Sequence, residues 1–188
     1  MKKFLLGAFV SAFLLACNND KKEDKTVSTD TTSSPTSATT QGNGSFELLS
    51  MSDADIVKNY TAAFAKGDVD GMIANFDDNI QARWSNGDSI IGKKAVQDYY
   101  KGRVALIDSL NYSDQIFLPV NMLTEQTKYA PVGKWVLAWS FAHAKYKNGK
   151  KLNFWVHSAN HINAAGKIDF IATYHDRTLI MSMSKGEL

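Results

Sequence analysis

The residues best suited to chemistry in this chain are aromatic, histidine and small polar side chains on otherwise apolar faces of predicted elements. Histidine titrates near neutral pH, so His143 and His175 are candidates for general acid–base work. Polar groups set into an apolar wall are typical of small-molecule pockets. The candidate set is Tyr60, Trp84, Trp139, His143, Ser158, Asn160 and His175.

Each candidate also has a purely structural interpretation. Tyr60 fits a core tyrosine with one hydrogen bond as well as it fits a ligand contact. Trp84 and Trp139 fit packing as well as stacking on a flat ligand. A buried histidine is often satisfied by one neighbouring group. The sequence leaves these alternatives open.

Metal and cofactor chemistry are not predicted. His157 and His161 have the spacing of a metal pair on a helix, but four residues of a strand span about 13 Å, too far for one ion. The sequence has no glycine-rich phosphate loop and no nucleophile elbow. We expect Asp169 to face inward near a turn and Asp176 to face outward, and each is interpreted as a surface carboxylate.

The stretch from Trp135 to Asp176 must position most of the candidates. Large and small side chains alternate along its first part, which is the period of a strand. Asn148-Gly149 then predicts a two-residue hairpin turn. Such a turn would place Trp139 opposite Ser158, with both side chains on the same face.

This register predicts the two faces of a three-stranded meander. The inner face would carry Trp135, Leu137, Trp139, Phe141, His143, Leu152, Phe154, Val156, Ser158, Asn160 and Ile162. If Ala165-Gly166 forms a second two-residue turn, Asp169, Ile171, Thr173 and His175 join that face. The outer face would carry Ala138, Ser140, Ala142, Ala144, Trp155, His157, Ala159, His161, Phe170 and Tyr174.

Upstream of the meander, the sequence predicts three helices and three shorter strands. The helices are expected at 52–66, 68–77 and 93–109, each with one apolar stripe, and the strands at 80–84, 89–91 and 112–121. Residues 181–188 are expected to form a polar, frayed end. This order predicts an α+β fold, in which a strongly curved, mostly antiparallel sheet wraps around the three N-terminal helices as a cone.

The N-terminus has the pattern of an export signal. Residues 1–16 join a basic start to an apolar run that is too short for an ordinary membrane span. Leu14-Leu15-Ala16-Cys17 resembles the lipobox of bacterial lipoproteins, which implies cleavage before Cys17, acylation of that residue and a membrane anchor in the cell envelope. An ordinary cleaved signal and a buried helix are the alternatives. Cys17 is the single cysteine, so no intrachain disulfide can form.

Residues 17–45 are predicted to be the lipidated cysteine and a disordered Ser/Thr-rich tether, and residues 46–188 one domain. The charged residues after Cys17 resemble a surface-export signal, with a solvated spacer as the alternative. Loss of residues 1–16 would remove Lys2 and Lys3. Of the 21 basic residues, 19 would remain, which equals the number of acidic residues. A neutral chain is an unlikely partner for nucleic acid.

Two blocks of sequence carry a family resemblance. One runs from Val57 through Gly67-Asp68 to Asn79, and the other comprises Gly166-Lys167-Ile168 and Tyr174-His175-Asp176. Together they resemble nuclear transport factor 2-like (NTF2-like) proteins, especially the SnoaL-like and ketosteroid-isomerase branches. The resemblance covers about residues 53–177 and implies a cone-shaped fold with a pocket between helices and sheet.

The resemblance also assigns positions in the pocket. The isomerase branch uses a tyrosine and a protonated aspartic acid as an oxyanion hole, and a second aspartate as general base. In this chain Tyr60 aligns with the position of that tyrosine, Trp84 with the position of the general base, and Ser158 with the position of the protonated aspartic acid. In the dehydratase-type branches a carboxylate sits near the end of the first helix, where this chain has Ala65-Lys66. Loss of a general base typically costs about 10²–10⁴-fold in rate, so isomerase activity should be weak or absent.

We therefore expect a binding module for a small, largely apolar ligand, with no cofactor. The first alternative is an isomerase, dehydratase or cyclase that uses His143 or His175 with Tyr60. The second is a structural or partner-binding domain with a filled cone, and a cavity above about 300 Å³ would argue against it. We also expect a homodimer through the outer face, which is too apolar for a solvated surface; family members commonly dimerise there.

Overall fold

The structure is a computed structural model that describes residues 44–183. Cys17, the expected signal peptide and nearly all of the expected tether lie outside this range. The strands are β1 (Phe46–Leu48), β2 (Phe76–Trp84), β3 (Ser89–Ile91), β4 (Ile107–Met122), β5 (Gly133–Tyr146), β6 (Lys151–Ile162) and β7 (Ile168–Tyr174). The helices are the 3₁₀ turn η1 (Met51–Ala54), α1 (Asp55–Ala65), α2 (Val69–Ile73), α3 (Lys93–Leu106) and α4 (Arg177–Met183).

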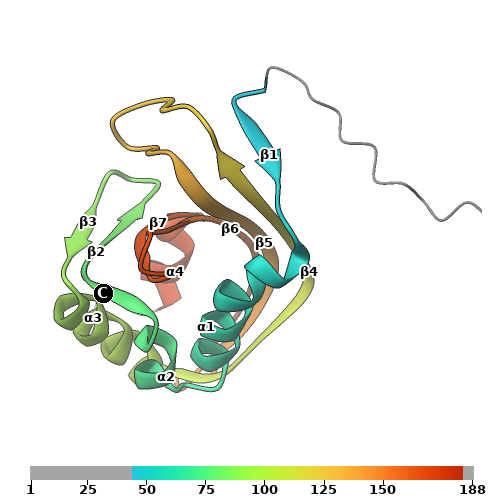
Figure 1. The fold of residues 1–188 in the computed structure, drawn as a ribbon. Helices are drawn as coiled ribbons and strands as arrows, with labels where there is room; N and C mark the ends of the chain where they lie inside the picture. The colour runs from blue at the N-terminus through green and yellow to red at the C-terminus, as the bar shows by residue number, and fades with distance from the viewer. Residues whose placement is uncertain (1–43, 184–188) are drawn as a thin grey trace, which may run out of the picture. The chain divides into compact units, whose positions relative to one another are not determined.

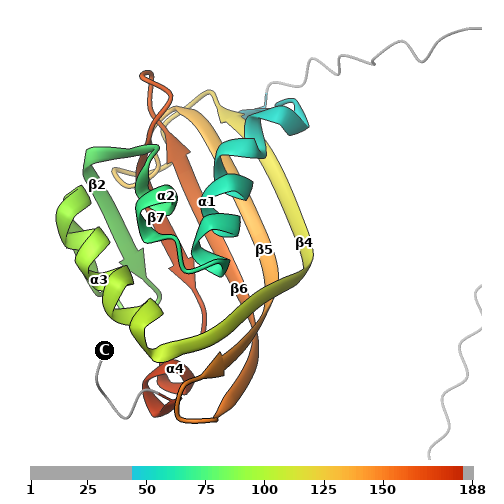
Figure 2. The same cartoon turned by 90° about the horizontal axis from the view of Figure 1, so that it is seen from below.

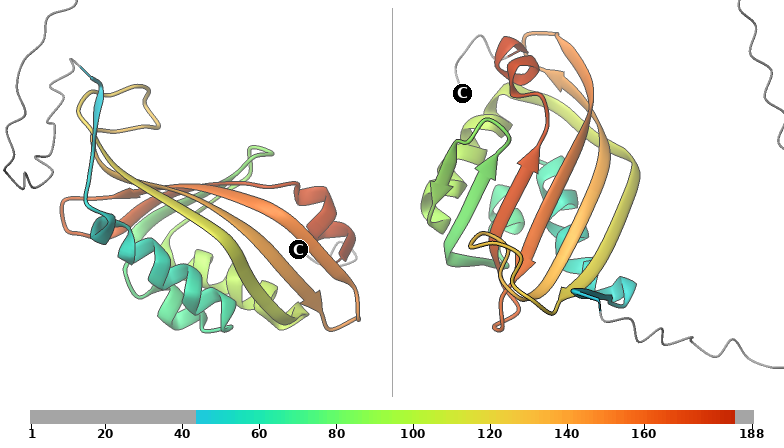
Figure 3. Two further views of the ribbon diagram at one scale, coloured as in Figure 1. Left: turned by 90° about the vertical axis from the view of Figure 1, so that its right-hand side faces the viewer. Right: turned by 90° about the horizontal axis from the view of Figure 1, so that it is seen from above.

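The strands form one curved sheet in the order β1-β4-β5-β6-β7-β2-β3. All neighbours are antiparallel except β2 and β7, which are parallel. Helices α1, α2 and α3 cover the concave side (Figures 1 and 2), and the left view of Figure 3 shows the curvature. The predicted α+β fold, with a mostly antiparallel sheet around N-terminal helices, is confirmed.

The N-terminal helices follow the expected signals with small shifts. Ser50, not Ser52, caps η1, because its hydroxyl accepts from the backbone N–H of Ser52 at 3.4 Å. Asp68 caps α2 as predicted, accepting from the N–H of Gly71 at 2.8 Å. The α2 helix ends early because Phe76 pairs with Ile168 in the sheet, and this tertiary pairing overrides local propensity.

The β5–β6 hairpin differs from the prediction in its turn. The N–H of Tyr146 donates to the carbonyl of Lys150 at 2.8 Å, so the loop has three residues, ending in Gly149 at φ 84°. A three-residue loop with glycine in the left-handed region is the next most common hairpin after the two-residue loop. It moves the register by one residue and places Ala138, not Trp139, opposite Ser158.

This shift reverses the predicted faces of β5. A one-residue change of register moves every side chain of a strand to the other face. The inner face of β5 therefore carries the small side chains that were expected outside: Ala138, Ser140, Ala142 and Ala144. The large side chains Leu137, Trp139, Phe141 and His143 lie on the outer, convex face. The predicted inward orientation of Trp139 and His143 is wrong.

The β6–β7 turn also has three residues, but a bulge compensates for it. The N–H of Asn163 donates to the carbonyl of Lys167, and the register shifts between His161 and Ile162. Ser158 therefore pairs with Thr173, as the two-residue turn predicted. Asp169 does not face inward as expected; its carboxylate lies 2.6 Å from Nδ1 of His161.

Residues 177–183 form α4, so 181–183 are helical and not frayed as expected; the rest of the expected frayed end, 184–188, lies outside the described residues. The carboxylate of Asp176 accepts from the N–H of Thr178 at 2.9 Å and begins the helix. Ile180 is 3% exposed and packs into the core. In Figure 2, α4 lies at the end of the sheet near the β5–β6 turn. Among the described residues, no helix is both long and apolar enough to cross a bilayer.

Candidate functional site

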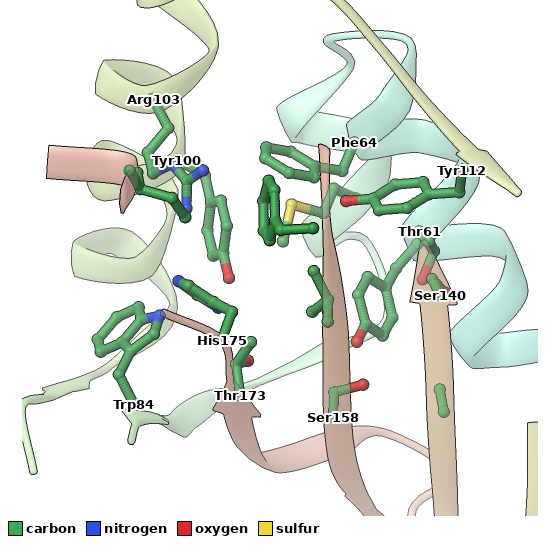
Figure 4. A pocket seen from close by; sticks show the side chains of 16 residues that line it. Thr61, Phe64, Trp84, Tyr100, Arg103, Tyr112, Ser140, Ser158, Thr173 and His175 are labelled. Carbon is green, nitrogen blue, oxygen red and sulfur yellow. The ribbon is translucent and has the colours of Figure 1, made fainter. Parts of the chain in front are cut away.

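A cavity of about 80 Å³ lies between the helices and the concave face of the sheet. Figure 4 shows its walls, formed by side chains of Tyr60, Thr61, Phe64, Met72, Trp84, Tyr100, Arg103, Tyr112, Ala138, Ser140, Phe154, Val156, Ser158, Thr173, His175 and Ile180. This volume is below the roughly 300 Å³ of pockets for drug-sized ligands, but it can hold several water molecules or a compact ligand. The cavity is thus smaller than the roughly 300 Å³ that would by itself indicate a ligand pocket.

The structure brings four of the seven sequence candidates to the cavity wall: Tyr60, Trp84, Ser158 and His175. Asn160 is fully buried directly behind them. Trp139 and His143 are separated from this group because they lie on the outer face. There, the ring of Trp139 stacks on His157 at 4.6 Å, and Nε2 of His143 lies 2.9 Å from Oγ of Ser113.

Tyr60, Ser158 and Asn160 form one hydrogen-bonded group. The hydroxyl of Tyr60 donates to Oδ1 of Asn160 at 2.7 Å. The Asn160 amide donates to Oγ of Ser158 at 3.0 Å and to the carbonyl of Val136 at 2.9 Å. Burial raises the pKa of Tyr60 to about 12, so its phenol is neutral at physiological pH. This group fixes α1 against β6.

His175 follows directly after β7 and differs from that group in having no partner. Both its ring nitrogens are buried, and neither has a hydrogen-bond partner among residues 44–183. Burial lowers its pKa to about 4, and the charges of Arg103 and Arg177 act in the same direction. The imidazole is therefore neutral near pH 7, with one donor and one acceptor available inside the cavity.

Arg103 is the most consequential residue that the sequence analysis missed. It lies on α3, is 8% exposed and lines the cavity. Val96, Tyr100 and Arg103 are the buried residues of that helix, and their spacing of four and three is that of one helical face. This spacing could have predicted that Arg103 is buried. An assignment of the buried face of α3 from its apolar residues alone does not include Arg103.

A second, open cleft of about 320 Å³ lies on another part of the surface, beside Asp77, Tyr129, His161 and Asp169. Four of its polar side chains are paired with one another: His161 with Asp169, and Asp77 with Asn163 at 2.9 Å. No group of three or more potential metal ligands occurs within the described range. The cavity beneath the helices is the better candidate site, because buried nitrogens of His175 and Arg103 have no partner there among the described residues.

Comparisons with known proteins identify the fold. No family model matches the sequence, and no curated protein is significantly similar to it. A candidate polyketide cyclase from Xanthomonas campestris pv. campestris matches with a TM-score of 0.56 and 18% identity, over 70% of this chain and 95% of that one. An NTF2-like protein of unknown function from Burkholderia pseudomallei K96243 matches with a TM-score of 0.54 and 11% identity, over 71% and 98% of the two chains.

A third match is TerC co-crystallised with polyporic acid, with a TM-score of 0.53 and 10% identity, over 71% of this chain and 98% of that one. These similarities establish that this chain has the NTF2-like fold, as the sequence resemblance predicted. At such identities they establish the fold alone.

Proposed function

We propose that residues 46–188 form the ligand-binding domain of a lipid-anchored envelope protein, and that the cavity takes a compact, largely apolar molecule. The observation that carries this proposal is that neither ring nitrogen of His175 has a hydrogen-bond partner in the described part of the chain. Buried polar groups nearly always have a hydrogen-bond partner. A bound molecule would supply the partner that the protein does not.

The other walls of the cavity support the same conclusion. Phe64, Met72 and Ile180 offer apolar contact area, and Trp84 lies near His175 in Figure 4. Hydroxyl groups of Thr61, Ser140 and Thr173 provide polar contacts around the edge. The co-crystallisation of TerC with polyporic acid is consistent with small-molecule binding by this fold.

Catalysis is the second candidate function, favoured by the similarity to a candidate polyketide cyclase. Proton abstraction needs a base whose pKa is close to the working pH. None of the cavity-lining residues is a carboxylate, and the lowered pKa of His175, about 4, makes it a weak base at neutral pH. His143, the other histidine considered, lies on the outer face. Binding therefore ranks above turnover.

The test is a screen of compact apolar and amphipathic molecules against the full chain, by calorimetry and protein NMR. Ala138→Leu would fill the cavity from β5 and should abolish binding. Ala159→Leu is the matched control, because Ala159 pairs with Leu137 on the outer face, and it should leave binding unchanged.

Two results would contradict the proposal. If no compound in the screen binds, the cone is filled by its own side chains and acts as a structural domain. If an activated enone is isomerised at a rate within a few-fold of an authentic isomerase, the domain is an enzyme.

A further inference from the structure

The positive charge of Arg103 is a feature of the cavity that an apolar ligand does not explain. Its Nε atom is buried and has no hydrogen-bond partner among the residues that the structure describes. None of the ion pairs within residues 44–183 includes it. A buried charge without a counter-charge is strongly unfavourable, so an arginine in this position requires a group of opposite charge.

The phenols of Tyr99 and Tyr146 are hydrogen-bonding neighbours of the Arg103 guanidinium, but no described group supplies a counter-charge. Its electrostatic neighbours are the phenols of Tyr99, Tyr100 and Tyr146. Burial raises the pKa of both Tyr100 and Tyr146, so these phenols carry no charge at physiological pH. None of the described residues that line the cavity is an aspartate or glutamate. The site thus offers a cation, a neutral imidazole and neutral hydroxyls, with no internal anion.

We infer that the cavity binds the anionic end of its ligand, and that Arg103 is the residue that holds it. The inference rests on the proposed function and specifies its ligand as a short organic acid with an apolar remainder. A guanidinium presents a planar fork that matches a carboxylate. Figure 4 shows Arg103 and Tyr100 on one side of the cavity and His175 beneath them, so that the acid would sit between α3 and β7.

The experiment compares propionate with propionamide, which has nearly the same shape and no charge. Both are titrated into the full chain at constant ionic strength, with sodium chloride as the balancing salt, and the Nε–H signal of Arg103 is followed by NMR. We expect propionate to shift this signal saturably and propionamide to bind at least about tenfold more weakly. Propionate should also raise the pKa of His175, because an anion nearby stabilises the imidazolium.

Arg103→Gln should reduce propionate affinity by about tenfold or more. Arg83→Gln is the matched control: Arg83 also has a buried Nε without a partner, but its guanidinium lies 4.2 Å from the Tyr129 ring, outside the cavity lining. Equal affinity for propionate and propionamide, unchanged by Arg103→Gln, would overturn the inference and leave the proposed binding function standing. No saturable binding of either probe would overturn both.

Discussion

The hydroxyl of Tyr60 is committed to the protein. It donates a hydrogen bond to Oδ1 of Asn160, a residue with 0% exposure whose Oδ1 atom has no other donor among the described residues. The resemblance to isomerases placed Tyr60 where those enzymes have an oxyanion-hole donor, but here that donor is already engaged. Tyr60 thus stabilises the wall of the cavity before any ligand arrives.

Tyr60→Phe should therefore lower the free energy of unfolding by about 1–3 kcal/mol, since it leaves a buried acceptor unsatisfied. Tyr112→Phe is a suitable control, because the Tyr112 hydroxyl also borders the cavity and makes no hydrogen bond to a described residue; it should change stability by less than about 0.5 kcal/mol. Urea denaturation of the two variants measures the difference. Equal destabilisation by both would contradict the assigned role of the Tyr60–Asn160 bond.

His175 should make stability depend on pH in a defined window. Its pKa of about 4 in the folded chain lies below the ordinary histidine value of 6.5, so the unfolded chain binds the extra proton. Its stabilising contribution is complete above pH 6.5 and is lost as the pH falls towards 4. After allowance for partial exposure, unfolding at pH 5 should be easier than at pH 7 by about 1–2 kcal/mol. In His175→Gln the difference in unfolding free energy between pH 5 and pH 7 should shrink. If it is unchanged, other groups cause the pH dependence.

At the level of elements, the β5–β6 turn decides which residues reach the cavity. Its three-residue loop depends on Gly149 at φ 84°, a conformation in which side chains other than glycine are strained. The alternation of large and small residues along β5 is the same whichever face is buried. The length of the turn, not the pattern, selects the face.

Gly149→Ala should cost about 1–2 kcal/mol of unfolding free energy, because alanine is disfavoured at positive φ. Gly102→Ala, on α3, should instead stabilise by about 0.5–1 kcal/mol. An added Cβ would meet nothing within 4 Å at either site, so the pair isolates the backbone effect. Denaturation midpoints of the two variants test it, and changes of the same sign would refute the explanation.

The sequence was sufficient to predict the order of elements from α1 to β7 and the inner face of β6 with Ser158 and Asn160, but it did not predict β1 or α4. It could not predict the faces of β5, because Asn148-Gly149 fits a two-residue or a three-residue loop and a single residue decides between them. The position of Arg103 was obscured for another reason. Its charge suggested an exposed side chain, whereas its helical spacing indicates a buried one.

At the scale of the molecule, the convex face of the sheet is more apolar than predicted, because the large side chains of β5 lie there. Trp155 and Tyr174 are 54% and 51% exposed, and rings of Trp139, His157 and Tyr174 stack across three strands. We propose that a second copy of the chain covers this surface. Trp155→Glu should then yield monomers.

Light scattering at tens of micromolar protein measures the oligomeric state. Ile91→Glu is the control, since Ile91 is 64% exposed on the edge strand β3 and its replacement should leave a dimer intact. A monomeric unmodified chain would contradict the proposed dimer.

The membrane anchor is tested at Cys17, which follows the apolar N-terminal run. Cys17→Ser removes the thiol that the lipobox resemblance marks for acylation, and the protein should move from the membrane to the soluble fraction. Fractionation of cells that express either form measures this change. Retention of the serine variant with detergent-extracted membrane proteins would contradict the lipoprotein assignment.

The parallel pairing of β2 with β7 has a consequence for the order of assembly. Trp84 is aligned with Thr173, and the chain between them runs through β3, α3, β4, β5 and β6. The wall that carries Trp84, Thr173 and His175 therefore closes only after the last strand has been synthesised and docked, with the entropy of a long loop to overcome. A chain that stops before β7 would lack a whole side of the cavity, so any quality control that senses an unfinished interior would act at the very end of synthesis.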